Sequence, residues 1–120
     1  MYNRKIPVTL DCGLDLAAAV LYGKWKMRLL YFIGQGYLRP SDLHRKIPDA
    51  SRRVVQAQLR ELMIHELVDK VIYPELPLKV EYNLTELGQS LIPFISTLGE
   101  WADQHEDHLR RVISASLNTD

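Results

Sequence analysis

Three long polar side chains recur at helical spacing in the middle of the chain and have the chemistry of base recognition. Arg53, Gln56 and Arg60 lie within one short stretch. An arginine can donate two hydrogen bonds to the edge of guanine, and a glutamine can pair with adenine in a similar two-bond manner. A solvated polar face on an isolated amphipathic helix would explain the same residues. The secondary structure predicted on either side of these residues therefore decides between a DNA-binding face and an ordinary solvated face.

A helix over residues 51–65 is predicted to carry these side chains. Val55, Leu59 and Leu62 follow one another at steps of four and three, the spacing of a stripe that faces a core. At about 100° per residue, the outward side holds a second set of positions. These are Arg53, Gln56 (at the flank), Ala57, Arg60 and Ile64. A helix with this outer side suits the major groove of DNA.

Three further residues suit phosphate rather than bases. Ser51 stands at the N-cap position, where its hydroxyl and the first backbone N–H groups fit a phosphate oxygen. Arg52 beside it fits phosphate or solvent. Lys79 lies at the base of a predicted hairpin, where a phosphate contact and a solvated lysine are equally consistent with the sequence.

Three shorter elements precede this helix. Helices are expected over residues 14–22 and 25–33 because of their propensity and apolar spacing. A short helix begins at Pro40-Ser41-Asp42, with Ser41 as its cap, and ends before Pro48, which cannot continue it. A short helix, a turn and a helix with a basic outer face together predict a helix-turn-helix.

A β-hairpin is expected directly after the basic helix. Residues 67–73 and 78–84 are rich in β-branched and aromatic side chains, and Pro74-Glu75-Leu76-Pro77 separates them. The predicted fold is mainly α with a small β-hairpin, a winged helix-turn-helix with an N-terminal helix and long C-terminal dimerisation helices. The wing spans about 67–84.

The C-terminal region, about 85–117, is expected to form the dimerisation helices, with Thr85 as N-cap and Pro93 as a kink or first-turn residue. Leu87, Leu91 and Ile95 are expected to pack in the core. The apolar positions beyond the winged unit should instead pack on a second subunit. They are Leu98, Trp101, Leu109, Val112 and Ile113.

Composition narrows the class of protein. The 120 residues suit one domain, and no stretch is long and apolar enough for a membrane span. The net charge is zero, but residues 1–60 carry +7 and residues 61–120 carry −7, which favours a polyanion-facing half. With one cysteine and no export signal, the expected location is the cytoplasm.

Enzymatic and metal chemistry have no support in the sequence. No catalytic constellation, phosphate loop or dinucleotide fingerprint is present, so neither an enzyme nor a cofactor is expected. His105 and His108 flank two acidic residues at helical spacing, but they lack the further ligands that zinc needs. No metal site is therefore predicted.

Cys12 is a candidate redox sensor. Asp11 and Asp15 would raise the pKa of its thiol and a helix N-terminus at residues 13–14 would lower it, so the sequence leaves a reactive and a structural cysteine equally open. Without a second cysteine in the chain, oxidation would give a sulfenic acid, an adduct with a small thiol, or a disulfide to another subunit.

Several motifs in order make the chain resemble the HxlR family of bacterial winged-helix transcription regulators, which are relatives of the MarR type. The resemblance runs from Cys12 to about Trp101. It is carried by Cys12 followed by Gly23-Lys24-Trp25-Lys26, Arg39-Pro40-Ser41-Asp42-Leu43, Gln58-Leu59-Arg60-Glu61-Leu62, and Val80-Glu81-Tyr82-Asn83-Leu84-Thr85 with Gly88. The resemblance implies a homodimer on a pseudo-palindromic double-stranded operator, and some relatives sense oxidants through the N-terminal cysteine.

The sequence departs from that family pattern at three positions. Gly13 follows Cys12 where many members have proline, Leu78 replaces a wing proline, and Glu66 stands where a glycine usually ends the recognition helix. We expect the junction at Glu66 to be capped differently. Two alternatives remain: a small-molecule-responsive regulator with an inert Cys12, and a winged-helix module for protein–protein contact.

Overall fold

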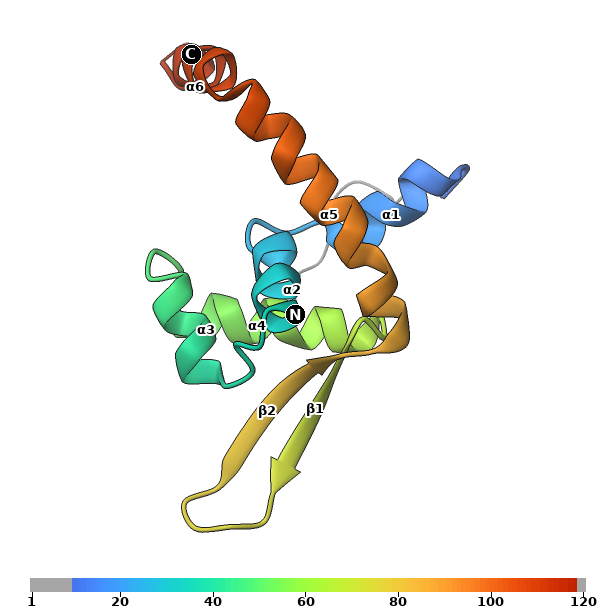
Figure 1. Ribbon diagram of the computed structural model, residues 1–120, viewed down its shortest axis with the longest axis vertical. Helices are drawn as coiled ribbons and strands as arrows, with labels where there is room; N and C mark the ends of the chain where they lie inside the picture. The colour runs from blue at the N-terminus through green and yellow to red at the C-terminus, as the bar shows by residue number, and fades with distance from the viewer. Residues whose placement is uncertain (1–9, 119–120) are drawn as a thin grey trace.

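The computed structural model describes residues 10–118, which form six helices and one two-stranded antiparallel sheet (Figure 1). The elements in chain order are α1 (Gly13–Leu21), α2 (Lys26–Gly34), α3 (Pro40–Lys46), α4 (Arg52–Ile64), β1 (Val68–Tyr73), β2 (Lys79–Leu84), α5 (Glu86–Gln104) and α6 (Glu106–Leu117). This order confirms the predicted winged helix-turn-helix. In Figure 1 the hairpin extends from one side of the helical unit, and α5 carries α6 away on the other.

The core lies among α2, α3, α4 and the base of the hairpin. The predicted stripe Val55, Leu59 and Leu62 is buried there. The other buried apolar side chains come from the neighbouring elements: Trp25, Leu29, Leu30, Ile33, Leu43, Ile47, Ala50, Leu67, Val68 and Tyr82. None of the residues of α1 or α6 is buried. The winged unit thus has a core of its own. Among the end helices, α1 packs against this core only through Val20 and Leu21, and α6 supplies no residue to it.

Helix starts follow the predicted caps in two cases out of three. The Ser51 hydroxyl accepts from the Val54 N–H at 3.1 Å, and the Thr85 hydroxyl accepts from the Gly88 N–H at 3.0 Å. The prediction that Ser41 caps α3 is wrong, because α3 already begins at Pro40. Proline suits the first helical position, where a missing N–H leaves no hydrogen bond unmade.

The junction between α4 and β1 has the geometry usually made with glycine. Glu66 takes a left-handed φ of 61°, its N–H donates to the Met63 carbonyl at 3.0 Å, and the Leu67 N–H donates to the Leu62 carbonyl at 2.9 Å. These two bonds form a Schellman cap. The expectation of a different cap is therefore wrong: the junction forms the turn that glycine usually makes, and a glutamate occupies its left-handed position.

Helix α5 begins in close contact with the wing. A Cβ added at Gly88 would lie 2.1 Å from the Leu67 carbonyl oxygen, which already accepts from the Thr85 N–H at 3.1 Å. No side chain larger than hydrogen fits there without moving the backbone. Gly88 therefore fixes how α5 leaves the hairpin.

The break in the C-terminal region is at His105, whereas Pro93 lies inside α5. Leu91 and Ile95 pack against the core as expected, but Leu87 is 58% exposed, so its predicted core position is wrong. Leu87 faces outward, while the next residue, Gly88, takes the position against the wing. Within residues 10–118, no helix has both the length and the apolar character to cross a bilayer.

Candidate nucleic-acid interface

The helix α4 presents a positively charged outer surface. Arg52, Arg53 and Arg60 are exposed, and no acidic side chain in the described part of the chain forms an ion pair with them. Ile64 is exposed on the same helix, whereas Ala57 is partly buried and lines a shallow groove with Val54. We call the surface of Ser51, Arg52, Arg53, Gln56, Ala57 and Arg60 the α4 face. The structure brings these predicted residues together on one helix.

Two contacts from the start of α2 hold α4 in place. The Trp25 N–H donates to Gln58 Oε1 at 2.9 Å, and Lys26 Nζ forms an ion pair with Glu61 Oε1 at 2.8 Å. A Cβ on Gly23 would lie 3.0–3.1 Å from the Lys26 side chain, so the glycine leaves room for it. The motif at residues 23–26 and the motif at residues 58–62 are therefore in direct contact in the fold.

The hairpin supplies a buried tyrosine behind the α4 face. The Tyr82 hydroxyl donates to Gln56 Oε1 at 3.3 Å. Burial raises the pKa of Tyr82, and the nearby Arg60 guanidinium opposes part of that rise. Sequence reasoning placed Tyr82 in a motif but missed this contact, because nothing local links a strand residue to a helix 26 positions away.

The wing carries Lys79, which is predicted to contact phosphate, and a second lysine, Lys70, which the sequence did not single out. Lys79 lies 3.7 Å from the Glu81 carboxylate and 4.9 Å from the Tyr73 ring centre, so part of its charge is neutralised. Lys70 is exposed and pairs with Tyr82 across the hairpin, which puts both side chains on one face of the sheet. The sequence could have indicated Lys70 only through its pairing with Tyr82, which belongs to one of the sequence motifs.

Cys12 is exposed at the N-terminal end of α1. It occupies the N-cap position, and its side chain caps no backbone N–H. The thiol is therefore accessible to an oxidant or to another thiol. Its neighbour Asp11 donates its N–H to the Asp15 carboxylate at 3.1 Å, so one of the two acids is tied to the first turn.

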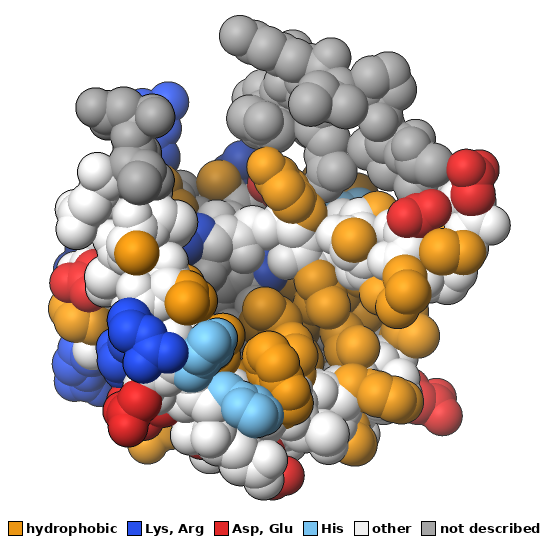
Figure 2. All heavy atoms as spheres, turned by 90° about the horizontal axis from the view of Figure 1, so that it is seen from above, with side chains coloured by type: hydrophobic (Ala, Val, Ile, Leu, Met, Phe, Trp, Pro, Cys, Tyr) orange, Lys and Arg blue, Asp and Glu red, His pale blue; other side chains and the backbone are white. Residues whose placement is uncertain are grey.

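The residues expected to meet a second subunit lie on α5 and α6. Trp101 is 52% exposed, Leu98, Val112 and Ile113 are exposed, and Leu109 is partly buried. Viewed from the end of the molecule that carries α6, hydrophobic side chains gather into a broad patch (Figure 2). Such a patch on a small protein marks an interaction surface.

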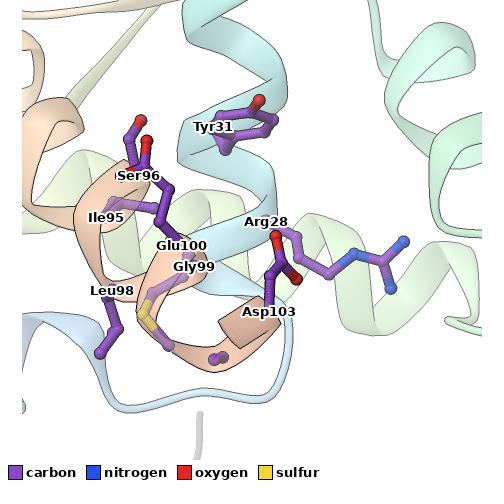
Figure 3. A pocket seen from close by; sticks show the side chains of 10 residues that line it. Arg28, Tyr31, Ile95, Ser96, Leu98, Gly99, Glu100 and Asp103 are labelled. Atoms are coloured by element: carbon purple, nitrogen blue, oxygen red, sulfur yellow. The ribbon is translucent and has the colours of Figure 1, made fainter. Parts of the chain in front are cut away.

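A groove of about 570 Å³ is lined by residues of α2 and α5. Figure 3 shows Arg28 and Tyr31 on one wall and Ile95, Leu98 and Asp103 on the other. Most of its wall is apolar, with Arg28, Glu100 and Asp103 supplying charges. Among the described residues, no cluster of three or more His, Cys, Asp or Glu side chains is placed to hold a metal.

Comparison with known proteins places the chain in a family. The model of the HxlR-like helix-turn-helix family matches residues 20–110. The uncharacterized HTH-type transcriptional regulator YkvN of Bacillus subtilis is 40% identical over 97 residues, which are 81% of this chain and 82% of that protein. An uncharacterized HTH-type transcriptional regulator of Methanothermobacter thermautotrophicus is 39% identical over 97 residues, covering 81% of this chain and 74% of that one.

A solved relative has the same fold. The redox regulator HypR in its reduced form matches with a TM-score of 0.79 and 34% identity, over 83% of this chain and 99% of that chain. In its oxidised form the TM-score is 0.73. The family and these relatives are transcription regulators rather than enzymes. The chain belongs to the HxlR-like helix-turn-helix family and is a transcriptional regulator of the helix-turn-helix type.

Proposed function

We propose that the protein binds a specific double-stranded operator as a homodimer, with α4 in the major groove and the hairpin along the backbone. One observation carries this proposal: the arginines of the α4 face are exposed and have no acidic partner in the described part of the chain. Unpaired guanidinium groups on a rigidly held helix suit phosphates and guanine edges. An interaction module for an acidic protein partner would use the same charge but would not select among duplexes.

Each residue of the α4 face has a role in this proposal. Arg53, Gln56 and Arg60 contact base edges, and Ser51 with the first N–H groups of α4 contacts a phosphate. Arg52 contributes a second phosphate contact. Ala57, being small, lets the helix approach the bases. Lys70 and Lys79 on the wing serve the backbone, and Lys79 contributes less because Glu81 holds part of its charge.

The uncovered apolar side chains of the end helices support the proposed homodimer. No residue of α1 is buried, although the sequence of α1 is almost entirely apolar, and α5 and α6 expose Leu98, Trp101 and Ile113. A second copy presents the same surfaces, and a two-fold arrangement buries them together. We propose residues 51–65 as the recognition unit, 67–84 as the wing and 85–117 as the dimerisation unit.

The test is binding of fluorescein-labelled duplexes, first selected from a random pool, measured by anisotropy. Arg53→Ala and Arg60→Ala should each weaken operator binding by about 1–3 kcal/mol. Their affinity for random DNA should change less. Arg110→Ala removes the same charge from α6, where Arg110 is paired with Glu106, and should change neither value. Equal affinity of the wild type for every duplex would contradict sequence-specific binding.

A redox response through Cys12 is a second candidate, favoured by its exposed thiol. Two Cys12 thiols from two subunits would each lose a proton and an electron to an oxidant such as diamide. The two sulfur atoms would form one disulfide, and diamide would be reduced to its hydrazine form. Oxidation should then change operator affinity, produce a covalent dimer on a non-reducing gel, and have no effect on Cys12→Ser. An unchanged operator affinity after complete thiol oxidation would leave Cys12 inert, as the small-molecule alternative requires.

A further inference from the structure

The side chain of Tyr82 is fixed at the point where the hairpin meets α4. It is only 2% exposed, and its backbone N–H donates to the Leu38 carbonyl at 2.8 Å in the connection between α2 and α3. A tyrosine held both by its ring and by its backbone has little freedom to move its hydroxyl. The position of the Tyr82 hydroxyl is therefore set by the fold and not by bound DNA.

The contact of this hydroxyl determines how the Gln56 amide is oriented. Tyr82 Oη donates to Gln56 Oε1 at 3.3 Å. A tyrosine hydroxyl is protonated at neutral pH, and burial raises the pKa of Tyr82 further. The oxygen and nitrogen of an amide diverge from one carbon, so an oxygen that faces Tyr82 turns Nε2 away from it. Gln56 then offers hydrogen-bond donors on the exposed side of α4.

The two orientations of a glutamine amide suit different bases. Guanine presents N7 and O6, both acceptors, in the major groove, whereas adenine presents the N7 acceptor and the N6 amino donor. A glutamine that is free to use both ends pairs with adenine. A glutamine whose oxygen is turned toward the protein presents its amide N–H donors to the groove, and these match guanine.

We propose that Tyr82 is a positioning residue for base specificity: it engages the Gln56 oxygen and so makes α4 select guanine over adenine at the position that Gln56 contacts. This inference depends on the proposed DNA-binding function. It changes the expectation for Gln56, which from its residue type alone was a reader of adenine. Arg60, one helical turn away, remains free to contact a neighbouring base or phosphate.

The experiment compares sequence preferences selected from randomised duplexes by wild type, Tyr82→Phe, Gln56→Ala and the double variant. The operator position at which Gln56→Ala loses selectivity is the Gln56 position. There the wild type should prefer guanine over adenine by about tenfold, and Tyr82→Phe should lower this ratio to below about threefold. In the Gln56→Ala background the Tyr82→Phe change should have no further effect on the ratio.

Tyr73→Phe is the matched control. It also removes one hydroxyl from the hairpin, but that hydroxyl donates to Glu81 at 3.1 Å and has no hydrogen bond to α4. It should leave the preferred base unchanged. Tyr82→Phe should melt within a few degrees of wild type, because the lost bond is long and Gln56 is an exposed residue whose amide can turn to bind water instead.

Three results overturn the inference while leaving operator binding intact: adenine preferred by the wild type at the Gln56 position, an unchanged preference in Tyr82→Phe, or no position that depends on Gln56. A wild type that selects no sequence overturns the proposed function as well. If Tyr82→Phe does not fold, NMR of the wild type decides. A Tyr82 hydroxyl proton protected from solvent in wild type and not in Gln56→Ala supports the inference, and an unprotected one overturns it.

Discussion

The ammonium group of Lys26 on α2 forms an ion pair with the carboxylate of Glu61 on α4, with an Nζ–Oε1 distance of 2.8 Å. The Lys26 side chain is 0% exposed and the Glu61 side chain is 42% exposed. The pair therefore joins a buried charge to one that water still reaches. Together with the Trp25–Gln58 hydrogen bond, it ties the helix with the α4 face to the helix that lines the groove against α5.

Glu61→Ala should destabilise the protein by about 2–3 kcal/mol, because it leaves the buried Lys26 ammonium group without a counter-charge. This loss of stability is smaller than the loss expected for a fully buried ion pair, because water can reach the space beside residue 61. Urea unfolding followed by circular dichroism measures it. Glu106→Ala breaks an ion pair of equal length, 2.8 Å, whose two side chains are exposed, and should cost less than about 1 kcal/mol. Equal losses in both variants would contradict a special role for the buried pair.

Gly88→Ala should lower the free energy of unfolding by at least about 2 kcal/mol, since its new methyl group would meet the Leu67 carbonyl oxygen. Gly99→Ala is the control on the same helix. A Cβ at Gly99 has no atom within 4 Å, and alanine has the higher helix propensity, so this variant should gain up to about 1 kcal/mol. Thermal melting of the two variants should therefore shift in opposite directions.

Glu66→Gly should stabilise the protein by roughly 0.5–1 kcal/mol, because glycine takes a φ of 61° without a clash of its Cβ. Glu66→Ala keeps the Cβ and removes only the carboxylate, so it should stay within about 0.5 kcal/mol of wild type. Chemical denaturation of the pair separates the backbone effect from the charge effect. A gain in the alanine variant equal to that of glycine would assign the effect to charge.

Ile113→Asp should shift the protein from dimer to monomer in analytical ultracentrifugation and weaken operator binding, since burying a new carboxylate in an apolar interface is costly. Ser114→Asp adds the same charge to the next residue of α6, which points away from the apolar side of that helix. It should leave the sedimentation coefficient unchanged. A monomeric wild type at micromolar concentration would rule out the proposed dimer interface.

Local patterns predicted most of the elements. The helix expected over 51–65 is observed as Arg52–Ile64, because an N-cap serine and an apolar stripe depend only on residues close in the sequence. The hairpin strands likewise agree within one residue of the expected ranges. Glu66 shows the opposite case, where the surrounding cap imposes a conformation that the residue itself disfavours.

The sequence by itself determined the order of elements, the winged helix-turn-helix class and the set of basic residues on the α4 face, because helical periodicity and capping are short-range. Only the tertiary structure decided which partners the other polar side chains of α4 have. Trp25 and Lys26 contact Gln58 and Glu61, which are 33 and 35 positions away, and Tyr82 crosses 26 positions to Gln56. Such contacts depend on how the helices and the hairpin pack, and that packing sets which polar atoms remain free to meet DNA.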